Sequence, residues 1–116
     1  MNSEIELRDL AARFVLASLR SASTDKIRPI DWWPRARTAL ETAAGTQSFS
    51  MMVTKMAKKL QVETLIMSSN KEIFSIGEAL GTQFAEFRKL CMRESIYIVA
   101  MAQMMSDQAR DQEQPF

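Results

Sequence analysis

Few residues in this sequence could do chemistry, because histidine is absent from all 116 residues and Cys91 is the only cysteine. Histidine is the usual general base near neutral pH and the commonest metal ligand. Its absence excludes serine–histidine–aspartate triads, cysteine–histidine pairs and HExxH zinc sites. The sequence also contains no glycine-rich phosphate loop, dinucleotide fingerprint or paired-carboxylate metal motif. We therefore expect a protein that is not an enzyme and that has no catalytic residue, no cofactor and no metal site.

Two ionisable residues, Cys91 and Glu94, lie on an otherwise largely apolar face of the predicted C-terminal helix. Cys91 is expected to be a small buried hydrophobe, because only Arg88 and Lys89 are close enough in sequence to activate its thiol. Glu94 allows two interpretations. It reaches solvent if the apolar face drifts around the helix, or it pairs with a basic residue of a facing helix and fixes the packing register.

Basic residues are concentrated in the middle of the chain. Residues 26–93 contain 11 lysines and arginines against six acids, a net charge of +5, although the whole chain carries only +1. This cluster is either a solvated surface or a track for phosphate groups. The candidate phosphate-binding residues are Arg35, Arg37, Lys55, Lys58, Lys59, Arg88, Lys89 and Arg93. Nucleic acid is therefore one candidate partner, although no base-reading motif accompanies the cluster.

A second set of residues indicates contact with a protein partner. Only one of the adjacent Trp32 and Trp33 can face a core from a helix, which leaves the other as a candidate surface anchor. The nine methionines are either adaptable core residues or part of a malleable binding surface. The candidate partner-binding residues are Trp32, Trp33, Phe84, Phe87, Ile98, Met101 and Met105.

These residues must be positioned by helices. Three glycines and three prolines are few for a strand-rich fold, and 47% apolar residues are enough for a core. We predict an all-α, four-helix bundle-like single domain over residues 1–107, with a polar C-terminal tail at 108–116. Its helices are expected at about residues 3–19, 31–45, 48–67 and 69–105. The first is apolar on two sides, which predicts that it lies between other helices.

The last predicted helix contains a heptad seam, a repeat of residues spaced alternately by four and three. The seam comprises Ile73, Gly77, Leu80, Phe84, Phe87, Cys91, Glu94, Ile98, Met101 and Met105. A straight helix of about 37 residues would be roughly 55 Å long, too long for a domain of this size to cover. Either a kink near Gly77 or Gly81 folds the helix back, or part of it meets another chain. The spacing of Gly77, Gly81 and Ala85 by four also favours a close helix crossing.

The sequence thus predicts a non-catalytic helical protein–protein interaction module, as a homo-oligomer or as a small subunit of a larger complex. One alternative is a helical subunit of a nucleoprotein complex that contacts the nucleic-acid backbone through a central basic surface. Another is a small helical inhibitor or chaperone that docks on a partner enzyme. The N-terminus lacks a basic signal-peptide region, and the longest apolar run near the C-terminus has 7 residues, against about 20 for a membrane span. We expect a soluble cytoplasmic protein without a membrane partner.

Overall fold

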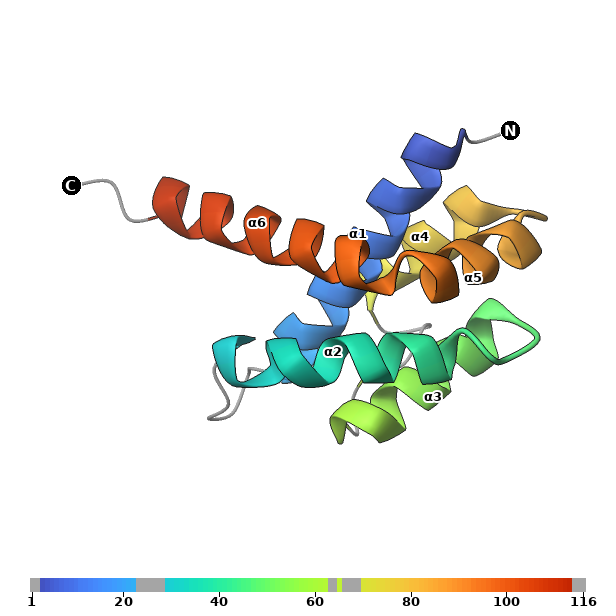
Figure 1. The fold of residues 1–116 in the computed structure, drawn as a ribbon, viewed down its shortest axis with the longest axis horizontal. Helices are drawn as coiled ribbons and strands as arrows, with labels where there is room; N and C mark the ends of the chain where they lie inside the picture. The colour runs from blue at the N-terminus through green and yellow to red at the C-terminus, as the bar shows by residue number, and fades with distance from the viewer. Residues whose placement is uncertain (1–2, 23–28, 63–64, 66–69, 114–116) are drawn as a thin grey trace.

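The computed structural model describes residues 3–22, 29–62, 65 and 70–113, and the side chains of residues 3–21, 33–62, 65 and 70–109. These residues form six helices and contain no strand, so the predicted all-α class is confirmed (Figure 1). The helices are α1 (Glu4–Ala22), α2 (Pro29–Ala43), α3 (Phe49–Leu60), α4 (Lys71–Leu80), α5 (Phe84–Arg93) and α6 (Ser95–Glu113). None of them combines the length and the apolar composition that a bilayer crossing requires.

Helix α1 is the central element. It runs obliquely between the other helices (Figure 1) and contacts α2, α3, α4, α5 and α6. Its N-terminus is capped by Ser3, as the predicted capping-box spacing indicates: Ser3 Oγ accepts a hydrogen bond from the Glu6 amide at 3.2 Å and donates one to Glu6 Oε1 at 3.3 Å. Apolar residues on both sides of α1 are buried, as predicted: Leu7, Leu10, Ala11, Ala12, Phe14, Val15, Leu16, Ala17 and Leu19.

Helices α2 and α3 form an antiparallel pair joined by a short turn (Figure 1). Helix α2 begins at Pro29 and not at the predicted Asp31, because proline is well suited to a first helical position. Helix α3 begins after Ser48, whose hydroxyl accepts a hydrogen bond from the Met51 amide at 3.2 Å.

The predicted continuation of the third helix to residue 67 is wrong. Gln61 has the left-handed backbone conformation (φ 57°), and its amide donates to the Lys58 carbonyl. The Val62 amide donates to the Ala57 carbonyl at 2.9 Å. These two bonds form a Schellman motif, which ends α3 at Leu60. Residues 63–64 and 66–67 lie outside the described part of the chain.

The predicted long C-terminal helix is divided into α4, α5 and α6, so the predicted kink near Gly81 is confirmed and the predicted continuity beyond it is wrong. The first break is at Gly81, one of the two predicted kink positions, where φ is 55° and glycine is favoured. The second break is at Glu94, whose φ of −120° and ψ of 30° are not helical. Gly77 remains inside α4. Gly77, Gly81 and Ala85 consequently do not share one helix face, and the predicted close crossing along that face is not formed.

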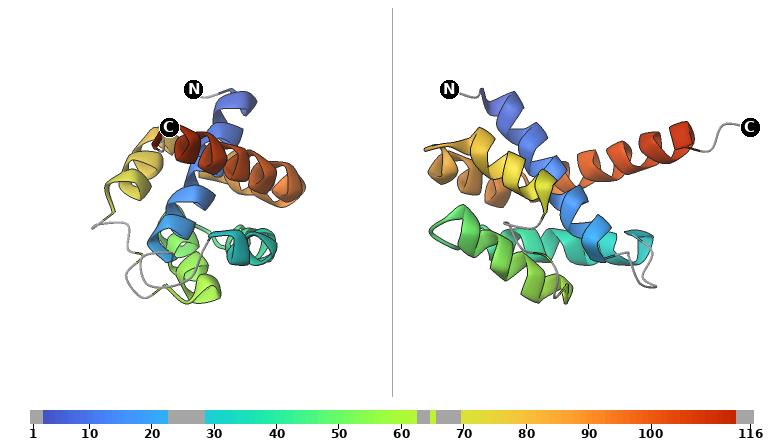
Figure 2. Two further views of the ribbon diagram at one scale, coloured as in Figure 1. Left: turned by 90° about the vertical axis from the view of Figure 1, so that its left-hand side faces the viewer. Right: turned by 180° about the vertical axis from the view of Figure 1, so that it is seen from behind.

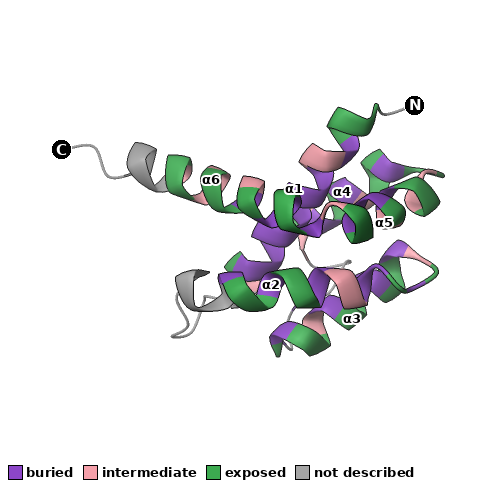
Figure 3. Cartoon of the chain, in the orientation of Figure 1, coloured by how far each residue is buried: buried purple, intermediate pink, exposed green. Residues whose placement is uncertain are grey.

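The core joins helices that are distant in sequence. The ring of Phe49 on α3 lies 5.4 Å from that of Phe14 on α1 and 6.3 Å from that of Phe87 on α5. Helix α6 contributes to this core mainly through its first half: none of its described residues beyond Ala102 is buried, although the half-buried Met105 also packs against the core. The rest of α6 extends away from the other helices (Figures 2 and 3). The radius of gyration is 13.3 Å.

The role of the aromatic core is testable. Phe87→Ala should lower the free energy of unfolding by about 3–5 kcal/mol, because the substitution removes a fully buried ring and leaves a cavity. Met92→Ala, on the exposed side of the same helix, should change it by less than about 0.5 kcal/mol. Urea unfolding at neutral pH measures the free energy of unfolding of both variants. A loss below about 1 kcal/mol for Phe87→Ala would contradict the core assignment.

Candidate functional site

The residues predicted to bind a partner mostly belong to the core. Trp33, Phe87 and Ile98 are buried, with 7%, 0% and 0% of their surfaces exposed. Phe84, Met101 and Met105 are half-buried and pack against the same core. The side chain of Trp32 lies outside the described residues. The heptad seam therefore marks the inward side of α4, α5 and α6, and its buried members cannot anchor a partner on the surface.

Several exposed apolar residues lie on the opposite side of the same segment, and the sequence analysis missed them; Ile5, Met51 and Phe74 are exposed elsewhere on the protein. Met92 at the end of α5 and Ile96, Tyr97 and Met104 on α6 are 49%, 62%, 57% and 60% exposed. Ala100 lies between them and is also exposed. We call Ile96, Tyr97, Ala100 and Met104 the α6 outer face. Met92, Ile96, Ala100 and Met104 are spaced by four, so this stripe could have been found as the complement of the seam.

A shallow hollow of about 470 Å³ adjoins the α6 outer face. It is lined by Arg37, Glu41, Met92, Arg93, Glu94, Ser95, Ile96, Tyr97 and Ala100. Its polar wall is fixed by the protein, because Glu41 accepts hydrogen bonds from Arg37 Nε at 2.9 Å and from Ser95 Oγ at 3.0 Å. The hollow therefore combines an apolar floor with a rigid rim of both charge signs.

An ion-pair network holds the junction of α5 and α6 against α1. Arg8 donates from Nε to Glu94 Oε1 at 2.7 Å and from Nη2 to Glu94 Oε2 at 3.3 Å. Arg93 pairs with both Glu4 and Glu94. The hydrogen bonds from Arg8 lower the pKa of Glu94, and the same contact raises the pKa of Arg8. Of the two interpretations of Glu94, pairing with a facing helix is thus confirmed.

The same network positions one residue of the α6 outer face. The Arg8 guanidinium lies over the Tyr97 ring, 5.9 Å from its centroid. This cation–π contact, together with the two hydrogen bonds to Glu94, restrains the first turn of α6. Tyr97 is consequently held in place on the surface although 57% of it is exposed.

The eight predicted phosphate-binding residues differ in their surroundings. They are divided among α2, α3 and α5. Arg37 pairs with Glu41, and Arg93 is part of the network with Glu4 and Glu94. Arg88 donates hydrogen bonds to the carbonyls of Ala44 and Thr46 at 3.2 and 3.4 Å, at the C-terminal end of α2. The spacing of Arg37 and Glu41 by four residues is typical of a helical ion pair, whereas sequence spacing gave no sign of the partners of Arg88 or of Glu4 as a partner of Arg93.

The lysines of α3 have a different environment. Lys55, Lys58 and Lys59 are exposed. Lys55 and Lys58 line a hollow of about 260 Å³ together with Thr46, Ser50, Met51 and Thr54. Hydroxyl groups and ammonium groups are typical donors to anionic oxygen. The outer side of α3 is therefore one part of the basic cluster that remains available to a ligand, and the exposed Lys89 of α5 is another.

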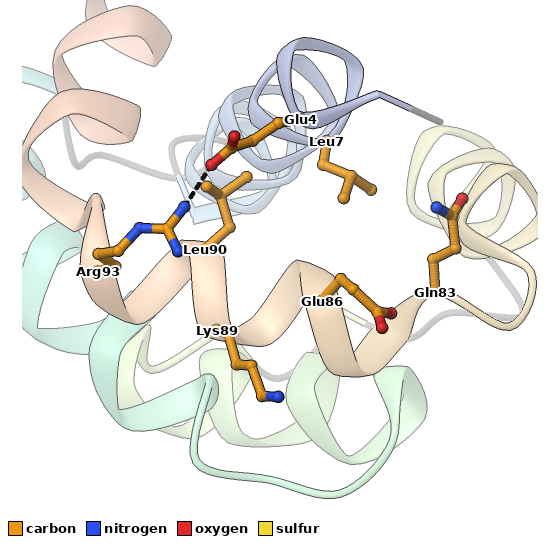
Figure 4. A pocket seen from close by; sticks show the side chains of 7 residues that line it. All are labelled: Glu4, Leu7, Gln83, Glu86, Lys89, Leu90 and Arg93. Atoms are coloured by element: carbon orange, nitrogen blue, oxygen red, sulfur yellow. Dashed lines mark hydrogen bonds and ion pairs between the residues drawn. The ribbon is translucent and has the colours of Figure 1, made fainter. Parts of the chain in front are cut away.

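A third hollow, of about 320 Å³, lies between the N-terminal part of α1 and α5 (Figure 4). Leu7 and Leu90 form its apolar lining. The other lining residues are Glu4, Gln83, Glu86, Lys89 and Arg93. Its two carboxylates and two cations leave no net charge, and Glu4 and Arg93 are paired with one another. This hollow therefore has no charge preference for a ligand.

The chemistry of Cys91 is limited by its position. The side chain is fully buried, and burial raises the pKa of the Cys91 thiol above its ordinary value. The thiol is consequently neutral at physiological pH and unreactive. Among the residues that the structure describes, no group of three or more cysteine, aspartate or glutamate side chains could hold a metal ion.

No protein-family model, curated protein or solved structure matches this chain. Its function is therefore inferred from the surfaces described above.

The Glu94 network predicts a specific pH dependence. Because the pKa of Glu94 is lowered in the folded state, its charge stabilises the fold above the unfolded-state value of about 4.3. That stabilisation is lost as the pH falls through the folded-state pKa. Glu94→Gln should therefore reduce the free energy of unfolding at pH 7 more than at pH 3. Urea unfolding at both pH values measures the difference, with Glu78→Gln on the exposed side of α4 as control. An equal loss at both pH values would contradict this role for Glu94.

Proposed function

We propose that this protein is a non-catalytic helical interaction module that pairs with a second copy of itself through the α6 outer face. One observation carries the proposal. Ile96, Tyr97 and Met104 expose more than half of their surfaces on one side of a helix that extends from the body of the protein (Figure 3). Large apolar side chains gathered on one surface are typical of protein interaction sites.

The order of residues on α6 favours a second copy as the occupant. Ile96 and Met104 each lie four residues from Ala100. If two α6 helices pack antiparallel with a two-fold axis at Ala100, Ile96 of each copy faces Met104 of the other. Such an interface is self-complementary, as closed dimers require. The small side chain of Ala100 lets the helices approach closely at the axis.

The surroundings of the α6 outer face are compatible with this pairing. The rim contains Arg37 and Arg93 together with Glu41 and Glu94, so a second copy meets both charge signs and is not repelled. Tyr97 contributes a restrained aromatic side chain, and aromatic residues are common energetic centres of interfaces. An interface of one helix face falls below about 1,200 Å², so we expect a weak, reversible dimer.

Sedimentation equilibrium tests the proposal. An interface of this size is weak and reversible, so a high protein concentration is needed to populate the dimer. At about 100 µM the wild-type protein should contain dimer. Ile96→Glu should yield monomer, since it places a charge in the apolar contact. Ile5→Glu is the matched control, because Ile5 is 73% exposed on α1 and lies outside the α6 outer face. It should leave the dimer unchanged.

The fold should survive both substitutions, because both side chains are exposed, and circular dichroism checks this. A wild-type protein that is monomeric at every concentration would overturn self-pairing. A dimer that Ile96→Glu and Ile5→Glu leave equally intact would place the interface elsewhere. A monomer that binds a different protein through Ile96 would replace the second copy by that partner.

A further inference from the structure

Helix α3 carries a second surface that is independent of α6. The hollow on its outer side is lined by Thr46, Ser50, Met51, Thr54, Lys55 and Lys58. Among the described residues, no carboxylate contributes to this lining. Helix α3 itself contains three lysines and no acidic residue. The hollow is therefore electropositive and offers groups that donate hydrogen bonds.

The positive charge of α3 is not neutralised by the protein. Within the described part of the chain, no ion pair joins Lys55, Lys58 or Lys59 to a carboxylate. By contrast, Arg37 and Arg93 are both paired with glutamates. An external anion could thus contact the lysines of α3 without first breaking an internal ion pair.

One hydroxyl of the hollow is also available. Thr46 Oγ1 donates to the Ala43 carbonyl at 2.7 Å, and Thr54 Oγ1 donates to the Ser50 carbonyl at 3.1 Å. The Ser50 hydroxyl is exposed and makes no hydrogen bond among the described residues. Ser50, Thr54 and Lys58 are spaced by four, so they lie along one side of α3. Ser50 and Lys58 also line the same hollow, so their hydroxyl and ammonium groups are both accessible to a ligand placed there.

The side of the hollow formed by Thr46 is held in place by hydrogen bonds from α5. Arg88 of α5 donates hydrogen bonds to the carbonyls of Ala44 and Thr46 at 3.2 and 3.4 Å. Thr46 is itself buried and lies just before the start of α3. The turn that carries Thr46 is thereby held against α5, which restrains this side of the hollow.

We propose that the hollow on α3 binds a phosphate group of a nucleic-acid backbone. Ser50 donates a hydrogen bond to a phosphate oxygen, and the ammonium groups of Lys55 and Lys58 contact the same group. Lys59 lies outside the hollow on the same helix and contacts a neighbouring phosphate. This extension of charge along α3 favours a polymer over a free phosphate ion.

The lining also defines how the nucleic acid is recognised. No aromatic side chain is among the described residues that line the hollow, so stacking of bases is not expected there. Contacts from lysine and serine to phosphate position a strand without reading its bases. Binding through α3 should therefore be independent of base sequence and strongly dependent on salt.

Salt-dependent binding to a labelled oligonucleotide, single-stranded or duplex, tests the site. Lys55→Gln/Lys58→Gln removes two charges from the hollow. Lys71→Gln/Lys89→Gln is the matched control, with the same change in net charge at two exposed lysines of α4 and α5. With duplex DNA the log–log salt slope should fall by about 0.9 in the first variant, because Lys55 and Lys58 contact the same phosphate and each phosphate contact contributes about 0.9. The control should change it much less.

Fluorescence polarisation from about 20 mM salt upwards measures the slopes, since low salt strengthens backbone contacts. Equal slopes for the two double variants would overturn the site. Absence of binding by the wild-type protein to both oligonucleotides at the lowest salt would do the same. Tighter binding to vesicles containing anionic phospholipid than to either oligonucleotide would replace nucleic acid by a lipid headgroup as the ligand.

A single-hydroxyl variant separates a built site from general charge attraction. Ser50→Ala should weaken oligonucleotide binding by about threefold to tenfold, because it removes a hydrogen bond to a charged group. Ser75→Ala, an exposed serine of α4, should have no effect. If both variants bind like the wild type, Ser50 does not contact phosphate and the hollow is not the site.

Discussion

Burial of both sides of α1 is the constraint on which the rest of the fold depends. A helix that is apolar on two sides must be covered on two sides, and α1 contacts all five other helices. Leu7, Phe14 and Leu19 span its length and are all buried. A straight C-terminal helix could contact α1 at only one crossing. Division of that segment into α4, α5 and α6 lets it contact α1 three times.

The charge network at the α5–α6 junction completes this arrangement. Glu94 lies where the helix breaks, and the break places its carboxylate against Arg8 of α1. Arg93 and Glu4 add a second pair between the same elements. The packing that covers α1 uses the inward side of α6, and it leaves the α6 outer face exposed, with Tyr97 in contact with Arg8. The candidate interface is thus a consequence of how α1 is buried.

The sequence predicted much of the local structure correctly. The capping of α1 by Ser3, the two-sided burial of α1 and the burial of Cys91 all follow from residue type and spacing, and the structure confirms them. Gly81 was one of two positions predicted for a kink, because glycine tolerates the backbone conformation that ends α4.

The breaks and the sites were harder to predict, because they depend on distant contacts. The heptad spacing continues through Glu94, and the helix break there accompanies a hydrogen bond to a residue 86 positions earlier. The same seam was interpreted as a partner surface, although Phe87 and Ile98 are core residues. The basic cluster was identified, but its division into paired arginines and unpaired lysines of α3 required the structure. Spacing alone cannot show which charges the fold neutralises.

Cross-linking at the proposed two-fold axis tests the central claim most directly. Ala100→Cys places two thiols at the axis of the α6 pair, whereas the native Cys91 is buried and inert. Under mild oxidation the variant should form a disulfide-linked dimer much faster than Ser75→Cys, a control at an exposed position of α4. Equal rates of dimer formation for the two variants would contradict self-pairing through the α6 outer face.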